Sequence, residues 1–388
     1  MSVSYWLDHS SQEEIHVDVT IIGGGITGIS IAYWLLKEDS SLNVLLVEKN
    51  KLAGGASGRN AGFITCGSVE HFNRLVELHG RNKAAEIWRF SEINLKLLKE
   101  HIIPEDPSAI EFEQNGSFSL ASTEQELNEL KKSAELMKSF DLAVEVLESD
   151  GVQERLGTTK FVGGIKYLDD ASVNPVKLIH HIKDKCFKIS NNFQILESSE
   201  VHSIEDSVVY SEKAKIKSDL IILATNGYSC TLDPYFNDKV HPTRGQILCT
   251  EPLESKLEAP CYANFVLDYF RQTSSGELLI GGFRQLQKDA EVGFSDETTE
   301  VIQKALEEFI ENYLPFAQGK KITHRWSGIM GFSSDGQPLI GSLPHSPQTF
   351  FAVGYTAHGL GLSFHCAKAL IDMIYERPFP DFISAKRF

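Results

Sequence analysis

The chain has 388 residues, of which 42% are hydrophobic and 23% charged, a composition typical of a globular protein. Its length exceeds the usual size of one domain and predicts two intertwined domains. The net charge of −16 argues against nucleic acid or an anionic membrane surface as a partner, and it indicates an acidic soluble protein more than a preference for a cationic substrate.

The first predicted elements form a strand–turn–helix–strand unit. Residues 17–25 (VDVTIIGGG) have the pattern of a buried strand that enters a glycine turn, and residues 26–38 have helical periodicity. Residues 42–48 (LNVLLVE) are a second apolar strand. Such a unit is typical of the opening of a doubly wound α/β sheet.

The glycine turn carries a dinucleotide-binding pattern. Gly23, Gly25 and Gly28 fit G-x-G-x-x-G, in which the glycines allow a tight turn, the approach of a pyrophosphate to the backbone, and close packing of helix on strand. Glu48 ends the second strand, where an acid accepts hydrogen bonds from a ribose. An acid there favours the unphosphorylated ribose of FAD or NAD over that of NADP.

A second glycine-rich stretch, residues 54–67 (GGASGRNAGFITCG), follows closely. Eight of its fourteen residues are Gly, Ala or Ser. Small residues let a chain run beneath the ribityl and isoalloxazine groups of a flavin without blocking them. The stretch therefore favours FAD over NAD.

The remaining elements alternate between amphipathic helices and short strands. They are a long helical region at 72–103, helices at 124–139, 174–188 and 296–313, strand-like pieces at 194–224, a β-hairpin at 262–285, and a glycine-rich strand end followed by a helix over 350–376. Strand–helix units recur at the start, the middle and the end of the chain. This recurrence predicts a discontinuous nucleotide-binding domain with a second domain inserted in two pieces.

The sequence indicates neither a metal site nor a membrane anchor. Six cysteines are scattered without a C-x-x-C pair, so reduced and mostly buried thiols are expected and no metal is predicted. The first 16 residues lack a basic segment followed by an apolar run, and no apolar segment reaches the length of a bilayer span. These features predict a cytoplasmic protein.

Several segments, in the same order along the chain, resemble those of the D-amino-acid oxidase/sarcosine oxidase superfamily of FAD-dependent oxidoreductases. The form GASGRNAGF is most similar to the γ-glutamylputrescine oxidase branch. The segments that resemble the superfamily are EKNKLAGGASGRNAGF (48–63), SDLIILATNGYS (218–229), VHPTRGQILCTEPL (240–253), LDYFRQTSSGELLIGG (267–282), RWSGIMGFSSDGQPLIG (325–341) and VGYTAHGLGLS (353–363).

The resemblance implies a Rossmann-like FAD-binding domain interleaved with a substrate domain built on a mixed β-sheet, with the flavin ring at their interface. Residues 1–90, 172–235 and 325–388 would form the FAD-binding domain, and residues 91–171 and 236–324 the substrate domain.

The resemblance also implies which residues surround FAD. Gly328 stands where some sarcosine oxidases tether the flavin through a cysteine, so non-covalent FAD is expected. The implied cofactor-binding residues are Gly23, Gly25, Ile26, Thr27, Gly28, Glu48, Lys49, Ala56, Ser57, Arg59, Asn60, Ala61, Gly62, Val201, Ala224, Thr225, Asp335, His358, Gly359, Leu360 and Gly361.

The implied reaction is hydride transfer to flavin from the carbon beside an amine nitrogen, which leaves an imine for hydrolysis. The sequence contains no Ser-His-Asp or paired-carboxylate motif, and this reaction needs no strong acid or base. The candidates for the substrate or flavin face are Arg59, Arg271, Trp326, Met330 and His358.

Four of these candidates carry alternatives. Arg59 contacts the flavin or anchors its own loop. Arg271 faces the substrate cavity or forms a salt bridge across the hairpin, and Trp326 walls the cavity or lies in the core. His358, between a small residue and a glycine, is expected beside the flavin rather than on the surface.

Met330 indicates which class of substrate the protein accepts. Relatives that oxidise amino acids, such as glycine oxidase, carry at this place an arginine that clamps the substrate carboxylate. Met330 disfavours a simple α-amino acid and favours a larger amine, or a substrate whose carboxylate is distant from the reacting carbon. Leu279 stands where sarcosine oxidases carry an oxygen-activating lysine, so molecular oxygen or another electron acceptor stays open.

Three functions compete. The first is a FAD-dependent amine oxidoreductase of the γ-glutamylputrescine type. The second is a flavin dehydrogenase or oxidase of an amino or hydroxy acid with an acceptor other than oxygen. The third is a flavin-binding subunit without catalysis, which the retained flavin segments and substrate strands disfavour.

Overall fold

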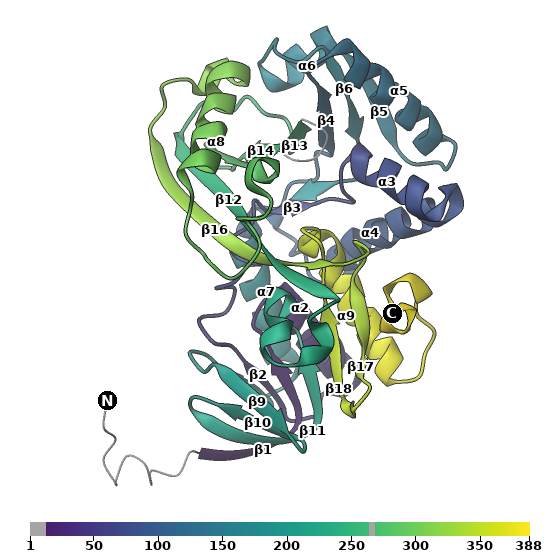
Figure 1. Ribbon diagram of the computed structural model, residues 1–388, viewed down its shortest axis with the longest axis vertical. Coiled ribbons are helices and arrows are strands. Elements are labelled where there is room, and N and C mark those ends of the chain that lie inside the picture. Colours follow the sequence, from purple (N-terminus) through teal and green to yellow (C-terminus); the bar gives the residue numbers. More distant parts are fainter. Residues whose placement is uncertain (1–12, 264–267) are drawn as a thin grey trace.

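The computed structural model describes residues 13–263 and 268–388. It contains two large sheets, one in the lower half of Figure 1 and one in the upper half, with helices packed on both. The prediction of an α/β fold with a mixed sheet is confirmed.

The lower sheet has eight strands in the order β17-β18-β11-β1-β2-β8, with the β9–β10 hairpin attached to β11. The pairs from β18 to β8 are parallel, and the four residues of β2 are all buried, as expected for a parallel strand covered on both faces. The strands are β1 (Glu13–Ile22), β2 (Val44–Val47), β8 (Phe193–Leu196), β9 (Val201–Glu205), β10 (Val208–Ser211), β11 (Ala214–Leu223), β17 (Leu339–Leu343) and β18 (Ser346–Val353).

The upper sheet has eight strands in the order β16-β12-β15-β14-β13-β4-β6-β5. It is mixed, because β13 and β4 pair in parallel while the other neighbours are antiparallel. The strands are β4 (Ser117–Ala121), β5 (Val144–Glu148), β6 (Gly163–Tyr167), β12 (Val240–Pro252), β13 (Cys261–Ala263), β14 (Asp268–Gln272), β15 (Glu277–Gly281) and β16 (Ile322–Ser333). A small ribbon of β3 (Phe63–Ile64) and β7 (Ala171–Ser172) lies between the sheets.

The helices agree with the predicted ranges except for the region 72–103 and for α6, which no predicted range covers. This region is two helices, α3 and α4, because Gly80 between them adopts a φ of 78°, a left-handed conformation that favours glycine. The helices are α2 (Ile26–Glu38), α3 (Val69–His79), α4 (Arg81–His101), α5 (Glu124–Lys138), α6 (Ser149–Leu156), α7 (Pro175–Ile189), α8 (Glu300–Tyr313) and α9 (Gly359–Ile374).

Two of the predicted domain boundaries fall inside elements of secondary structure. The boundaries at 90 and 325 fall inside α4 and β16, and β16 pairs with β12 as far as Ser333. Residues 264–267 of the predicted hairpin lie outside the described residues. The division into two domains stays a prediction, with the whole of β16 in the upper sheet.

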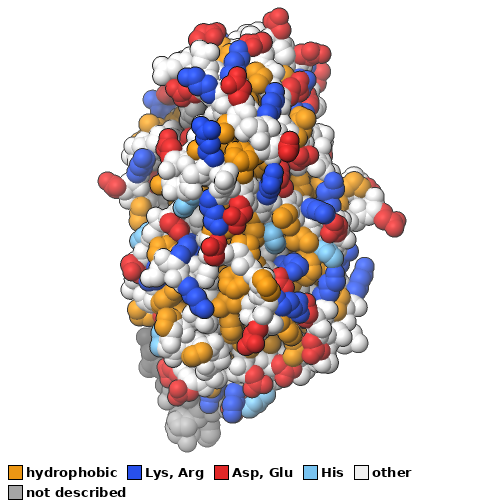
Figure 2. Space-filling view, turned by 90° about the vertical axis from the view of Figure 1, so that its right-hand side faces the viewer, with side chains coloured by type: hydrophobic (Ala, Val, Ile, Leu, Met, Phe, Trp, Pro, Cys, Tyr) orange, Lys and Arg blue, Asp and Glu red, His pale blue; other side chains and the backbone are white. Residues whose placement is uncertain are grey.

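The surface carries both signs of charge. Figure 2 shows acidic and basic side chains interspersed over one face, with hydrophobic side chains between them. All six cysteines are free thiols and five are buried, as expected from their scatter. Within residues 13–263 and 268–388, no helix combines the length and apolar character needed to cross a bilayer.

The parallel strands determine where a ligand can bind. Strands β1, β2, β11 and β18 run in one direction, so their carboxyl ends meet at one edge of the lower sheet. Ligands of doubly wound sheets bind outside the carboxyl ends of the strands. This edge faces the upper sheet (Figure 1).

The close contact between the start of α2 and the glycine turn gives a first prediction. A Cβ at Gly28 would lie 1.9 Å from the Gly23 carbonyl oxygen, so Gly28→Ala should destabilise the fold by about 1–3 kcal/mol in urea unfolding. The matched control is Gly359→Ala, in the first turn of α9, where the nearest atom is 3.9 Å away. The control should be neutral or slightly stabilising, because alanine favours a helix. Equal loss in both variants would contradict the packing described.

Candidate active site

One cavity of about 590 Å³ runs from the carboxyl edge of the lower sheet to the upper sheet. Its lining includes Glu48 after β2, Ala224 after β11, Gly282 after β15 and Met330 of β16. The volume lies within the range of small-molecule and cofactor sites. Both sheets therefore contribute to one binding site.

The glycine turn leaves room for a ligand at the start of α2. A Cβ at Gly23 would lie 2.6 Å from the Ala224 carbonyl oxygen, so no side chain fits between the two strand ends. Gly25 is the N-cap of α2, and no acidic side chain lies in the first turn. The positive end of the helix thus faces the cavity without an acidic side chain in its own first turn, which suits a pyrophosphate.

Glu48 both shapes the turn and lines the cavity. Its Oε2 accepts a hydrogen bond from the Gly24 amide at 2.7 Å, and its Oε1 accepts one from the Asn50 amide at 2.8 Å. Each carboxylate oxygen keeps a further lone pair for a ribose hydroxyl. The position of Glu48 fits its predicted role in binding a ribose. Its hydrogen bonds to the Gly24 and Asn50 amides also give it a structural role, because they fix the turn.

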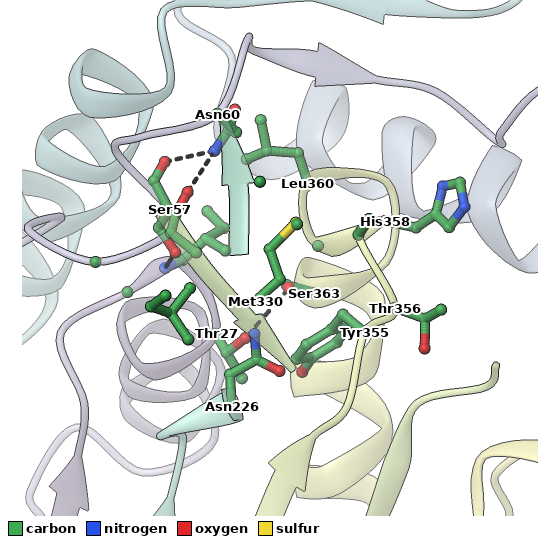
Figure 3. A pocket seen from close by; sticks show the side chains of 18 of the residues that line it. Thr27, Ser57, Asn60, Asn226, Met330, Tyr355, Thr356, His358, Leu360 and Ser363 are labelled. Carbon is green, nitrogen blue, oxygen red and sulfur yellow. Dashed lines mark hydrogen bonds between the residues drawn. The ribbon is translucent and has the colours of Figure 1, made fainter. Parts of the chain in front are cut away.

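The stretch after β2 is held in shape from within. The Asn60 Nδ2 donates to the carbonyl oxygens of Ala56 and Ser57, and its Oδ1 accepts from the Gly62 amide at 2.7 Å (Figure 3). The Ser57 Oγ accepts from the Ile26 amide at 2.9 Å, which ties this stretch to the start of α2. Ala56, Ser57, Asn60 and Ala61 all line the cavity. The small residues therefore form a cavity wall beside the glycine turn, and their short side chains leave the room that a flavin needs.

Arg59 anchors its own loop. Its Nε donates to the Gly54 carbonyl oxygen at 3.0 Å and its Nη1 to that of Ser327 at 3.1 Å, and it is absent from the cavity lining. The indole N–H of Trp326 donates to the Arg59 carbonyl oxygen at 2.8 Å. Trp326 is half-buried and belongs to neither the cavity wall nor the core, contrary to both expectations. Together the two side chains fasten the loop to β16.

Arg271 differs from both of its predicted roles. It is buried and lies outside the cavity lining, and no carboxylate of the described residues forms an ion pair with it. Its Nη1 instead donates to the carbonyl oxygens of Gly62 at 3.4 Å and Val173 at 3.3 Å. Burial lowers the pKa of this guanidinium. Arg271 therefore supports the loop at Gly62, whereas Arg59 holds it at Gly54.

A strained turn brings the start of α9 to the cavity. Thr356 and Ala357 have φ values of 47° and 68°, which are uncommon for residues with side chains. A Cβ at Gly361 would lie 2.2 Å from the Thr65 carbonyl oxygen, so the first turn of α9 packs directly on the chain near β3. The helix start lines the cavity through Gly359, Leu360 and Gly361, and its positive end faces a bound ligand.

His358 is the N-cap of α9 and lines the cavity, and its ring lies against His71. The two ring centroids are 4.5 Å apart, and the Arg74 Nη2 lies 3.1 Å from the His71 Nδ1. Burial and then the charge of Arg74 lower the pKa of His358 to about 4. Burial lowers the pKa of His71 as well, so both rings are neutral at neutral pH.

Four predicted cofactor residues are not part of the lining: Gly28, Arg59, Gly62 and Asp335. The Asp335 carboxylate forms an ion pair with Arg387 at 2.6 Å and accepts a hydrogen bond from the Gln337 amide, and its contact with FAD stays a prediction. Asp335 therefore fixes the C-terminal segment. The predicted residues that do line the cavity are Gly23, Gly25, Ile26, Thr27, Glu48, Lys49, Ala56, Ser57, Asn60, Ala61, Val201, Ala224, Thr225, Met330, His358, Gly359, Leu360 and Gly361.

The upper end of the cavity contains an aromatic group that the sequence did not single out. The Phe63 ring meets those of Tyr262 and Tyr269 edge to face, at centroid distances of 5.3 and 5.7 Å. Met330 points toward Leu360 (Figure 3) and occupies space left by Gly245, where a Cβ would lie 2.8 Å from the Met330 Cε. The alternation of the hairpin strands could have indicated the two tyrosines, whereas Phe63 depends on the loop path.

The two anchors of the loop give a second prediction. Arg59→Met should weaken FAD binding about 10-fold, because two hydrogen bonds that hold the loop are lost. Titration of apoprotein with FAD, followed by flavin fluorescence, measures the change.

The control for Arg59 is Asp296→Asn, which removes only an exposed ion pair of 3.7 Å. Such pairs contribute little, so FAD affinity should change less than about twofold. Unchanged FAD affinity in Arg59→Met with a large loss of turnover would instead place the guanidinium at the reacting groups.

The histidine pair gives a third prediction. The folded pKa of His358 is about 4, against an ordinary value of 6.5, so the unfolded chain binds a proton that the folded protein does not. Stability should therefore fall as the pH drops from about 6.5 toward about 4, and His358→Gln should reduce this fall by on the order of 1 kcal/mol. Urea unfolding at about pH 7 and about pH 5 measures it. His79→Gln, at the exposed end of α3, is the control and should behave as wild type.

The chain is similar over most of its length to known oxidoreductases. The chain is 26% identical over 387 residues to the probable oxidoreductase OrdL of Haemophilus influenzae, covering 93% of this chain and 85% of that protein. It is 24% identical over 379 residues to the γ-glutamylputrescine oxidoreductase of Escherichia coli, covering 92% and 83%. The crystal structure of glycine oxidase from Geobacillus kaustophilus superposes with a TM-score of 0.79 at 21% identity, covering 94% of this chain and 96% of that one.

The family comparison covers most of the chain. Residues 18–373 match the family model described as FAD dependent oxidoreductase (DAO). The matched range includes the glycine turn, the loop after β2 and the start of α9, which together line the cavity. The protein belongs to the family of FAD-dependent oxidoreductases.

Proposed function

We propose that the protein oxidises a C–N bond of an amine that is not a simple α-amino acid. The observation that carries the proposal is the continuity of one cavity, from the glycine turn of β1 and α2 to the aromatic group of the upper sheet. A substrate held by that aromatic group would lie against the part of the cavity that suits a flavin ring. The name of the E. coli relative supports an amine as the substrate.

FAD, when bound, supplies the acceptor for a hydride from the carbon beside the nitrogen, and the imine that remains is hydrolysed. The chain binds and orients the amine and limits the access of water. Phe63, Tyr262 and Tyr269 provide apolar surface for this purpose. The amide groups at the start of α9 would stabilise negative charge on a reduced flavin held in the cavity.

Met330 supports the exclusion of simple α-amino acids. Its side chain lies in the cavity, where relatives of the amino-acid-oxidising type are expected to carry an arginine. A thioether cannot neutralise a carboxylate, so an α-carboxylate beside the reacting carbon would be buried without a partner there. The same side chain accepts an alkyl chain well.

The electron acceptor is a separate question. Leu279, at the place expected for an oxygen-activating lysine, is absent from the cavity lining. None of the six cysteines lines the cavity either, which supports non-covalent FAD. Both hypotheses therefore remain: an oxidase that uses molecular oxygen, and a dehydrogenase that passes electrons to another acceptor.

The reaction gives a fourth prediction. Anaerobic mixing of the holoenzyme with a panel of compounds should bleach the flavin absorbance with alkyl amines and ω-amino compounds, and about 10-fold more slowly or not at all with glycine and sarcosine. Stopped-flow absorbance measures each rate, and admission of air then separates an oxidase from a dehydrogenase.

Other outcomes of the panel favour the other functions. Bleaching by glycine or sarcosine alone would overturn the interpretation of Met330. Bleaching by hydroxy acids alone would favour the second hypothesis, and no bleaching by any compound would favour a subunit without catalysis.

A further inference from the structure

The cavity contains a positive charge that pairs with no carboxylate in the described part of the chain. Arg284 lines it from the turn that follows β15, and among the described residues its guanidinium has neither an ion pair nor a hydrogen bond. Its Cζ lies 4.3 Å from the centroid of Phe332, another lining residue. Burial lowers the pKa of Arg284 below its ordinary value, yet a guanidinium stays protonated at neutral pH.

The carboxylate whose charge acts on Arg284 already forms an ion pair with another arginine. Glu291 interacts with Arg284, but it forms a buried ion pair with Arg244. The Arg244 Nε and Nη2 donate to the two Glu291 oxygens at 2.8 and 2.7 Å, and Gln246 donates to both oxygens as well. Glu291 therefore cannot satisfy Arg284, and the charge of Arg284 remains available to a ligand.

The backbone holds Arg284 in place at the cavity. Gly282 and Phe283 have φ values of 131° and 56°, two consecutive residues in the left-handed half of conformational space. The Phe283 amide donates to the Oδ1 of buried Asp268 at 2.8 Å, which fixes this turn. Backbone strain of this kind persists where surrounding contacts over-determine it, and it is concentrated at functional sites.

A second donor accompanies the guanidinium. The Tyr269 hydroxyl lies beside Gly281, where a Cβ would come within 2.4 Å of it, and it has no hydrogen-bond partner in the part of the chain described. Burial raises the pKa of Tyr269 to about 12, and the positive charge of Arg284 opposes this rise. The two groups are therefore electrostatic neighbours, and the hydroxyl keeps its proton at neutral pH. Lys288 adds a further cation where the cavity opens.

We propose that Arg284 and Tyr269 form an anion subsite that binds a carboxylate carried by the substrate at a distance from the reacting nitrogen. A planar guanidinium stacked on an aromatic ring presents an edge of N–H donors that matches a carboxylate. The substrate class is thus an ω-amino carboxylate or a larger amine with a remote carboxylate. The inference rests on the proposed function for the identity of the reacting amine, whereas the binding of the carboxylate is independent of any oxidation.

Calorimetric titration of the oxidised holoenzyme tests the subsite without turnover. The probes are pentanoate and pentanamide, which match in size and differ in charge. Pentanoate should bind at least about 10-fold more tightly than pentanamide to the wild type, and Arg284→Met should abolish the difference. Arg284→Lys should keep part of it, and Tyr269→Phe should reduce it a few-fold. The matched control is Arg325→Met, which loses an ion pair with Glu307 outside the cavity and should bind as wild type.

The variants are compared only after each has retained FAD with a wild-type absorbance spectrum. If Arg284→Met does not, Arg284→Lys and Tyr269→Phe decide the result. Pentanoate that binds no better than pentanamide to the wild type, or equally to the wild type and Arg284→Met, would overturn the subsite. Inorganic phosphate that binds as tightly as pentanoate would overturn the assignment to a carboxylate.

The amine panel distinguishes this failure from that of the proposed function. The panel includes 5-aminopentanoate and pentylamine, and Arg284→Met should raise the concentration of 5-aminopentanoate for half-maximal bleaching about 10-fold while the limiting rate stays similar. Failure of both amines with an intact preference for pentanoate would refute the amine reaction alone. Equal bleaching by the two amines with no preference for pentanoate would refute the subsite alone.

Discussion

The packing of α2 against α9 is the contact on which the site depends. The indole N–H of Trp34 donates to the Phe364 carbonyl oxygen at 3.0 Å, and the Thr27 Oγ1 donates to the Ser363 Oγ at 3.2 Å. These bonds join helices that lie more than 300 residues apart in the chain. Because both helices begin at the cavity, their positive ends converge on one ligand. The first can hold a pyrophosphate while the second faces the reacting end, so a small shift between them would misplace one end of the cofactor relative to the other.

Arg59 and Arg271, which support the loop, differ from Arg284, which lines the cavity. Arg59 and Arg271 donate to backbone carbonyl oxygens and hold the loop of small residues at Gly54 and Gly62. Among the described residues Arg284 has no such acceptor, and its guanidinium stacks on Phe332. The loop therefore has one arginine anchor of its own, Arg59, and one from the upper sheet, Arg271. The guanidinium left without a partner is therefore the one whose charge a ligand can use.

The sequence predicted the parts of the site that depend on local pattern. The unit of β1, α2 and β2 follows from apolar periodicity and glycine spacing, and the structure has it within a few residues of the predicted bounds. The ion pair of Asp335 could not be predicted, because its partner, Arg387, lies at the far end of the chain. The hydrogen bonds of Arg271 could not be predicted either, because its carbonyl acceptors belong to Gly62 in the loop and to Val173 just after β7, whose approach only the tertiary structure determines. The sequence could not single out Arg284, because an arginine without an ion-pair partner is recognised only when the partners of the neighbouring acids are known.

Net charge alone would have disfavoured an anionic substrate for a chain of −16. Screening by salt confines the field of exposed charges to about 8 Å under physiological conditions, so distant acids hardly affect a cavity. A guanidinium inside the cavity acts over shorter distances and at a lower effective dielectric constant, where its attraction for a carboxylate is several times stronger. Local charge therefore determines what binds, while the acidic surface affects only the rate of encounter. An anionic substituent and a strongly acidic protein are compatible, provided that the positive charge lies where water is partly excluded, as that of Arg284 does.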